Sequence, residues 1–143
     1  MNEYLFVYGS LRSSGQVPKQ IAHLASRFHR LGLATVRGRL YDLGQYCAAV
    51  LDDDAPLMIQ GELIELPSDG EVLAGLDRYE EIDPLDPANS LFVRKKTQAR
   101  LADGSTQNAW IYVYNRPTGE APSIESGDYH QFKSMSDTLL ACR

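Results

Sequence analysis

Hydrophobic residues follow two different spacings along the chain, and each spacing predicts a type of element. Short runs of aromatic and β-branched residues, bounded by Gly, Pro, Asn or Asp, are typical of strands. Such runs predict strands at residues 4–8, 33–41, 48–51, 58–66, 91–101 and 106–114. Between the last two runs, the Asp103-Gly104 pair predicts a tight hairpin turn.

Helical spacing, with apolar residues three and four positions apart, occurs in three segments. The first begins at Pro18 and contains Ile21, Leu24, Ala25 and Phe28, and Gly32 is expected to follow its end. The second helix is predicted over 71–81 and the third over 128–141. About six short strands and about three helices that do not alternate regularly predict an α+β fold with a strongly curved or closed sheet.

Composition narrows the possible classes of protein. The chain has 143 residues, 43% of them hydrophobic and 23% charged, which predicts a single domain over residues 1–143 with one core. A net charge of -5 argues against general nucleic-acid binding. Lysine and arginine exceed acidic residues in the first fifty positions, so this part could attract a small anion or could form a basic, solvated face.

The chain shows no sequence signal for a metal or a membrane. Cys47 and Cys142 form no C-x-x-C pair, so no zinc site is expected. No stretch approaches the roughly 18 apolar residues of a membrane span, and the N-terminal residues do not resemble a signal peptide. We therefore expect a cytoplasmic protein without a nucleic-acid or membrane partner.

One carboxylate of the second predicted helix is expected to face inward. At about 100° per residue, Glu80 lies about 40° from the centre of the apolar face, because it follows Leu76 by four positions and Leu73 by seven. Burial disfavours the charged form of a carboxylate, which suits a general acid or base near neutral pH. Glu80 is therefore a candidate catalytic residue. The alternative is a carboxylate that turns to solvent or pairs with an arginine.

The end of the first predicted strand offers a second candidate site. Tyr8-Gly9-Ser10-Leu11 places two small residues directly after an aromatic strand. Consecutive backbone N–H groups with little side-chain bulk can hold a carboxylate or a carbonyl oxygen. A simple turn after a core strand is the alternative. The context of Ser10 is not G-x-S-x-G, which argues against a nucleophilic serine.

Other residues have weaker claims to a functional role. Arg94 could pair with Glu80 or with a substrate anion, or could belong to a solvated basic face. Cys47 is more typical of a small core residue than of a nucleophile. Several aromatic residues could line a pocket, although core packing is their ordinary role: Tyr41, Phe92, Trp110, Tyr112 and Tyr114.

Taken in order, these segments resemble the γ-glutamylcyclotransferase-like family, which includes AIG2-like and butirosin-type cyclotransferases. F-V-Y-G-S-L at 6–11 is similar to the N-terminal signature of the family, and the segments 38–50 and 60–66 are similar to its next two blocks. L-D-R-Y-E at 76–80 resembles the L-D-x-x-E motif that holds the catalytic glutamate of the family. Phe92-Val93-Arg94 resembles its Y-x-R element, with Phe in place of Tyr.

The resemblance implies a small mixed-strand β-barrel with packed helices and an acyl transfer that needs no cofactor. The α-amine of a γ-glutamyl group would attack its own γ-carbonyl, giving 5-oxoproline and a free amine. Glu80 would act as general acid and base. The backbone at Gly9, Ser10 and Leu11, with Tyr8 beside it, would hold the glutamyl group, and Tyr114 is a further pocket candidate.

Two departures from the family pattern and two other functions remain open at this point. Phe92 lacks the hydroxyl that many members have, and Cys47 stands where many have Pro. The leaving amine is not indicated, so glutathione, γ-glutamyl amino acids, γ-glutamyl-lysine isopeptides and γ-glutamyl natural products are all possible substrates. The alternative functions are a non-catalytic barrel that binds a small ligand, and an amidohydrolase in which Glu80 activates water.

Overall fold

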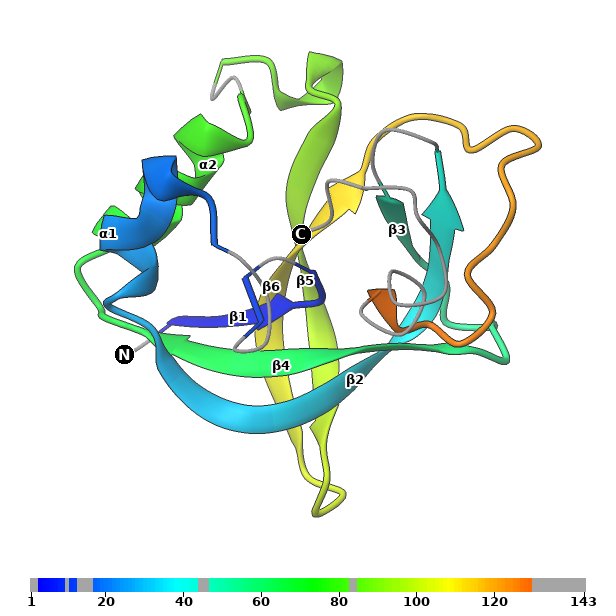
Figure 1. Ribbon diagram of the computed structural model, residues 1–143, viewed down its shortest axis with the longest axis horizontal. Coiled ribbons are helices and arrows are strands. Elements are labelled where there is room, and N and C mark those ends of the chain that lie inside the picture. The colour runs from blue at the N-terminus through cyan, green and yellow to red at the C-terminus, as the bar shows by residue number, and fades with distance from the viewer. Residues whose placement is uncertain (1–2, 10, 13–16, 44–46, 83–84, 130–143) are drawn as a thin grey trace.

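Six strands form one sheet that closes on itself (Figure 1). The computed structural model describes residues 3–9, 11–12, 17–43, 47–82 and 85–129. The strands are β1 (Glu3–Val7), β2 (His29–Asp42), β3 (Cys47–Leu51), β4 (Met58–Leu66), β5 (Phe92–Leu101) and β6 (Thr106–Tyr114). Their order is β3-β2-β4-β1-β6-β5, and β2 also pairs with β5, so all strands except β3 form a closed barrel. Since β1 runs parallel to β6 and the other pairs are antiparallel, the barrel is mixed, which confirms the predicted fold class.

The start of β2 corrects the prediction for the first helix. Only a turn of 3-10 helix (Lys19–Ile21) and the short α1 (Ala22–Ala25) are helical, and β2 already begins at His29. Gly32 lies inside β2, where the pairing register with β4 shifts, and its φ of 138° is one that residues with a side chain rarely adopt. This glycine therefore forms a bulge in a strand and does not end a helix.

The second predicted helix is confirmed with a shorter C-terminal end. Helix α2 runs from Glu71 to Tyr79, and a 3-10 turn follows at Pro87–Asn89. From residue 130 onward, the predicted third helix lies outside the described residues. The Asp103-Gly104 turn is confirmed, because Gly104 has a φ of 89° and the Asp103 carboxylate accepts the Ser105 N–H at 2.8 Å.

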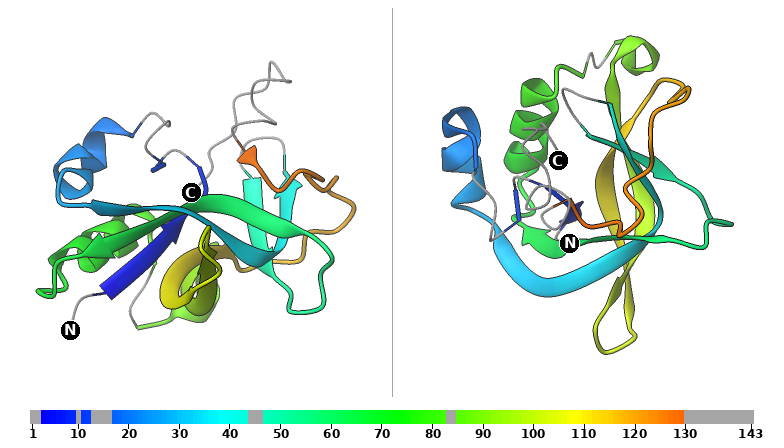
Figure 2. Two further views of the ribbon diagram at one scale, coloured as in Figure 1. Left: turned by 90° about the horizontal axis from the view of Figure 1, so that it is seen from below. Right: turned by 45° about the vertical axis from the view of Figure 1, so that its right-hand side comes forward.

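The alternation of side chains along the strands divides the apolar residues between two cores. Successive strand residues point to opposite faces, so Phe6 points into the barrel while Leu5 and Val7 point toward the helices. Helices α1 and α2 cover one side of the barrel in every view (Figures 1 and 2). The core between the barrel and the helices contains Leu5, Val7, Leu11, Ile21, Leu24, Ile64, Leu66, Val72, Leu73, Leu76 and Tyr112.

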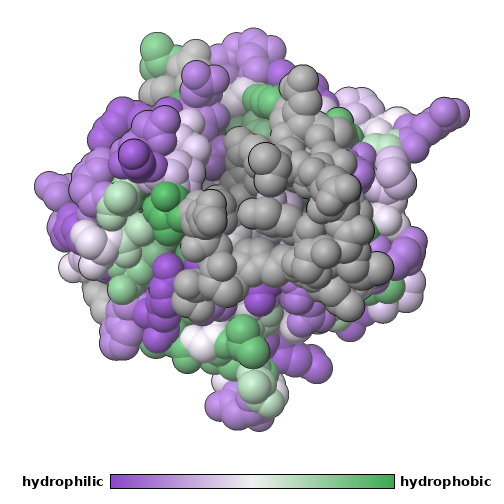
Figure 3. Space-filling view, in the orientation of Figure 1, coloured by the Kyte–Doolittle hydropathy of each residue, from purple (hydrophilic) through white to green (hydrophobic). Residues whose placement is uncertain are grey.

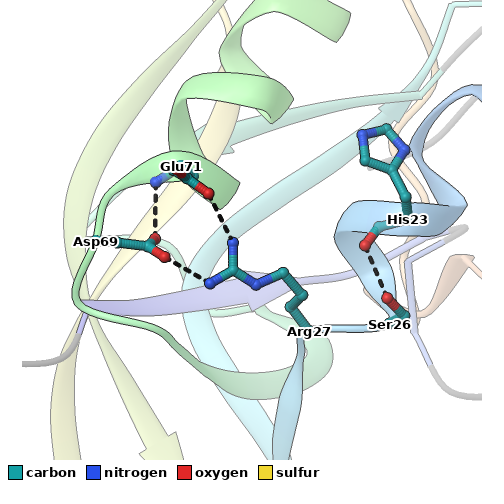
Figure 4. A network of polar contacts seen from close by, with 5 residues as sticks. All are labelled: His23, Ser26, Arg27, Asp69 and Glu71. Carbon is teal, nitrogen blue, oxygen red and sulfur yellow. Dashed lines mark hydrogen bonds and ion pairs between the residues drawn. The ribbon is translucent and has the colours of Figure 1, made fainter.

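A polar contact and a close approach hold α1 against α2. Arg27 follows α1 and donates to the carboxylates of Asp69 and Glu71 at the start of α2 (Figure 4). Asp69 also accepts the backbone N–H of Glu71 at 3.0 Å, which fixes the turn that leads into α2. On the buried side, a Cβ on Gly75 would lie 2.7 Å from a methyl group of Leu24, so a larger residue there would force the Leu24 side chain to shift.

The described surface is mostly polar. On the face shown in Figure 3, hydrophobic residues form several separate patches around the grey part. The exposed large apolar side chains are Leu31, Leu33, Tyr79, Leu85 and Leu91. Within the described residues, no helix is both long enough and apolar enough to cross a membrane.

Candidate active site

Glu80 lies at the C-terminal end of α2 and is buried. Helix α2 packs Val72, Leu73 and Leu76 against the barrel, and Glu80, one turn after Leu76, is only 8% exposed. This burial agrees with the inward position that the helical spacing predicts. Tyr79 lies three residues after Leu76, so helical spacing also predicts it on the apolar face, but it is 40% exposed.

The backbone after Glu80 forms a well-defined helix end. Glu81 adopts a left-handed conformation with φ of 58°. The Glu81 N–H donates to the Arg78 carbonyl at 3.1 Å, and the Ile82 N–H donates to the Asp77 carbonyl at 3.0 Å. This pair of bonds is the Schellman arrangement, with Glu80 as the C-cap residue. The backbone of Glu80 is therefore held in place from both sides.

Asp77, three residues before Glu80, connects α2 to the β5–β6 hairpin. Arg94 Nε donates to Asp77 Oδ1 at 2.9 Å and Arg94 Nη2 donates to Oδ2 at 3.0 Å. The Tyr112 hydroxyl also donates to Asp77 Oδ1, at 2.7 Å. Asp77 therefore accepts the paired bonds from Arg94 that the sequence analysis considered for Glu80. A side-on arginine–carboxylate pair fixes orientation as well as distance.

Tyr112 links this network to the end of β1. The Tyr8 hydroxyl donates to the Tyr112 carbonyl oxygen at 2.6 Å, and both side chains are almost fully buried. Burial raises the pKa of the Tyr112 phenol far above its ordinary value, and the bond to Asp77 and the charge of Asp77 raise it further. The charge of Glu80 acts in the same direction, so the phenol lies within electrostatic reach of Glu80. Tyr112 consequently remains a hydrogen-bond donor at physiological pH.

The ring of Trp110 packs against the guanidinium group of Arg94. The Arg94 guanidinium carbon lies 4.1 Å from the centre of the Trp110 ring, and Lys96 Nζ lies 4.4 Å from it. Trp110 Nε1 donates to Glu3 Oε2 at 2.8 Å, and this bond is the main reason that the pKa of the Glu3 carboxyl is lowered. The three side chains Arg94, Trp110 and Glu3 thus join β5, β6 and β1.

The segment after β1 is held by backbone and side-chain contacts. Tyr8 and Leu11 are buried, and the Arg12 N–H donates to the Gly9 carbonyl at 3.0 Å, closing a turn. Arg30 Nη1 donates to the Leu11 carbonyl at 3.0 Å and lies 3.5 Å from the buried Glu62 carboxylate. The turn is therefore fixed in place. Ser10, the remaining member of the predicted cradle, lies outside the described residues.

The backbone beneath this turn needs a glycine in β4. A Cβ on Gly61 would lie 2.2 Å from the Val7 carbonyl oxygen and 2.7 Å from the Phe6 ring. Such distances are far below normal contact, so β1 and β4 approach closely only because Gly61 has no side chain. Gly61 thereby sets the position of the last residues of β1, from which the cradle starts.

Tyr114 lies further along the same strand. It shares a face of β6 with Tyr112, because the two residues are two positions apart. Its ring meets Phe92 edge to face, with the ring centres 5.5 Å apart. Phe92 is 1% exposed, so the position at which many family members carry a hydroxyl is packed against Tyr114 here.

A chain of hydrogen bonds connects the end of β1 with α2. Tyr8 binds the Tyr112 carbonyl, and the Tyr112 hydroxyl binds Asp77 of α2, three residues before Glu80. Sequence reasoning gave no role to Asp77, Arg30 or Glu62, and it treated Tyr112 only as an aromatic residue of the core or a pocket. A usable signal was present for Asp77, since it precedes Glu80 by three positions, close to one helical turn.

Two further observations concern grooves and metal-binding groups in the described part of the chain. A groove of about 890 Å³ lies elsewhere on the barrel, beside Thr35, Arg37 and Arg100, and none of the described candidate residues lines it. Over the described residues, no three His, Cys, Asp or Glu side chains group in a way that could hold a metal ion.

The sequence and the fold are similar to those of known proteins. A profile described as "Gamma-glutamyl cyclotransferase, AIG2-like" matches residues 5–131. The γ-glutamylcyclotransferase family protein YtfP of Escherichia coli K12 is 31% identical over 126 residues, which covers 87% of this chain and 94% of YtfP. The structure of Bacillus subtilis YkqA has a TM-score of 0.69 at 25% identity, covering 94% of this chain but 43% of the longer YkqA chain. A mouse AIG2-like protein has a TM-score of 0.67 at 19% identity, covering 99% of this chain and 95% of its own.

Proposed function

Because the chain belongs to the γ-glutamylcyclotransferase, AIG2-like family, we propose that it cyclises a γ-glutamyl amine or amide to 5-oxoproline. The α-amine of the substrate attacks the γ-carbonyl carbon, a new C–N bond closes the five-membered ring, and the old amide C–N bond breaks. The α-ammonium nitrogen loses two protons as it becomes the N–H of the lactam, and the departing nitrogen gains two protons and leaves as an ammonium ion. The reaction consumes no water and needs no cofactor.

The observation that carries this proposal is the burial of Glu80 at the end of α2. A catalytic carboxylate must be shielded from water, held in one place, and close to the bound substrate. Glu80 is 8% exposed, its backbone belongs to the helix-end bonding described above, and its charge acts on Tyr112. In the proposed mechanism, Glu80 takes up each proton that the α-nitrogen loses and passes it to the leaving amine.

The turn after β1 supplies the second part of the proposed mechanism. The backbone at Gly9, Ser10 and Leu11 holds the glutamyl group, Tyr8 buttresses this turn, and Tyr114 lines the pocket. Ring closure within one molecule is fast when the reacting atoms are held close together, so most of the rate gain comes from folding the substrate into the attacking shape. The rigid attachment of the turn through Arg30 and the Tyr8 hydroxyl supports this role.

The test is a product assay with a matched pair of variants. Wild type, Glu80→Gln and Glu81→Gln are incubated with a panel of γ-glutamyl compounds, and 5-oxoproline, glutamate and the free amine are measured by mass spectrometry. Glu81 is the adjacent, exposed carboxylate, so its substitution controls for a general change of charge at the helix end. We expect 5-oxoproline from wild type and from Glu81→Gln, and a loss of at least about 100-fold in Glu80→Gln, the usual range for general acid–base catalysis.

The other products separate the competing functions. Glutamate in place of 5-oxoproline would identify an amidohydrolase that uses Glu80 to activate water. If no compound is converted, while one of them binds, the chain is a non-catalytic small-ligand barrel. Full activity in a folded Glu80→Gln variant would refute the role of Glu80, even if 5-oxoproline forms.

A further inference from the structure

Arg12, the residue after the cradle turn, has a buried donor atom without an acceptor. Its side chain is 11% exposed, and Nη1 binds Asp128 Oδ1 at 3.0 Å. Its Nε atom is buried and has no hydrogen-bond partner, and no other buried side-chain nitrogen or oxygen in the described part of the chain shares this condition. Nearly all buried polar groups in folded proteins are hydrogen-bonded, so this exception requires a reason.

The chemistry of the unpaired edge indicates the class of ligand. A guanidinium binds a carboxylate side-on through Nε and Nη2, which is how Arg94 binds Asp77 in this same protein. In Arg12 the ion pair with Asp128 uses Nη1. The ion pair leaves the Nε side of the guanidinium for a second carboxylate. A buried donor on a charged group destabilises the protein when it is unpaired, and a bound carboxylate removes that penalty.

The position of Arg12 relates it to the proposed site. The neighbouring Leu11 belongs to the same buried cluster, between the barrel and the helices, as Leu76 of α2. Arg12 instead binds Asp128, which precedes Tyr129, a residue packed into the barrel core with Tyr8. The turn therefore places Leu11 in the core that α2 covers and carries a guanidinium on the next residue, Arg12.

We propose that Arg12 binds the α-carboxylate of the γ-glutamyl substrate and of 5-oxoproline through its Nε edge. This inference rests on the proposed function and adds to it a choice of substrate: a free α-carboxylate is required, so α-esters, α-amides and 4-aminobutyryl analogues bind poorly. In this arrangement Arg12 binds the α-carboxylate and the backbone turn binds the γ-carbonyl. The α-amine is then the group that exchanges protons with Glu80. Arg12 is one of the basic residues in the first fifty positions, and binding of the substrate carboxylate is the role proposed for it.

The test compares two lactams that differ only in the carboxylate. Binding of 5-oxoproline and of neutral 2-pyrrolidinone is measured by NMR titration of the isotope-labelled full chain, for wild type, Arg12→Gln, Arg12→Lys and Asp128→Asn. We expect wild type to prefer 5-oxoproline, and Arg12→Gln to weaken its binding by about 10- to 100-fold, as expected for lost charge-assisted hydrogen bonds. The weak binding of 2-pyrrolidinone should be unchanged. Arg12→Lys should lie between, because it keeps the charge and loses the side-on geometry.

Asp128→Asn is the matched control for a purely structural role. It removes the same ion pair but leaves the guanidinium, so the preference for 5-oxoproline should persist. The proposal is overturned if wild type does not prefer 5-oxoproline, if Arg12→Gln weakens both lactams equally, or if it leaves 5-oxoproline binding intact. Binding that depends on Arg12 in a protein that converts no γ-glutamyl compound would keep this assignment and refute the cyclotransferase reaction instead.

Discussion

The contact between Arg94 and Asp77 should be a main support of the helix end that carries Glu80. The two side chains are 23% and 25% exposed, so solvent screens them only in part. Hydrogen bonds to charged groups contribute about 1.5–3 kcal/mol, and a cation over an aromatic ring adds about 0.5–1 kcal/mol. Replacing Arg94 by Met removes both hydrogen bonds and the ring contact, so we expect the free energy of unfolding to fall by about 2–4 kcal/mol.

A double-mutant cycle isolates the pair from its surroundings. Arg94→Met, Asp77→Asn and the double variant are unfolded with urea, followed by the fluorescence of Trp110, the one tryptophan of the chain, and by circular dichroism. We expect a coupling energy of about 1.5–3 kcal/mol. Arg94→Lys is the control, since it keeps the charge near Trp110 but cannot make the side-on pair, and it should retain part of the stability.

The outcome of the cycle decides how Glu80 is positioned. A coupling energy below about 0.5 kcal/mol, the value typical of an exposed ion pair, would refute the reasoning that this contact fixes the helix end. If the coupling is as large as expected, Arg94→Met should also lower the turnover of any γ-glutamyl substrate more than it raises the KM. Such a division follows from misplacing a catalytic group without removing a substrate contact.

Three further outcomes follow from local features. Replacing Glu81 by Gly should raise the free energy of unfolding by about 0.5–1 kcal/mol, because glycine adopts the left-handed conformation without strain; a lower melting temperature would contradict this. Gly61→Ala should destabilise the protein by at least about 2 kcal/mol, because its Cβ would overlap the Val7 carbonyl, and unchanged urea unfolding would show that β1 can move away. The bond from Arg27 holds the pKa of Asp69 below its ordinary value of 3.8, so its stabilising effect is complete above that pH and lost as the pH falls below it. Asp69→Asn should therefore reduce the loss of stability between pH 6 and about pH 3, and an unchanged acid profile would exclude this contribution.

Much of the candidate site could be predicted because it depends on local spacing. The periodicity of α2 places Glu80 with Leu73 and Leu76, and the structure finds it buried. The ranges of β4 and β6 are the same in prediction and structure, since strand alternation is also a local property. The chemical role of Glu80 remains a prediction, because burial alone does not establish catalysis.

The errors occurred where one local pattern is compatible with two structures. The spacing of apolar residues after Pro18 fits a longer helix, yet the chain enters β2 at His29, because pairing with β4 and β5 outweighs a weak helical preference. Gly32 is a helix-end signal in the sequence and a bulge in the structure, since both need a backbone that glycine adopts easily.

Local spacing along the chain predicts the strands, the apolar face of α2, the buried carboxylate Glu80 and the small-residue turn after β1. Local spacing does not predict the contacts between distant segments: the pairing of β2 with β5, the parallel pairing of β1 with β6, and the ion pair of Arg94 with Asp77. The physical reason is that periodicity is set by neighbours along the chain. The pairing of distant charges and strands depends instead on register and on the close approach of backbones, such as that of β1 and β4 at Gly61.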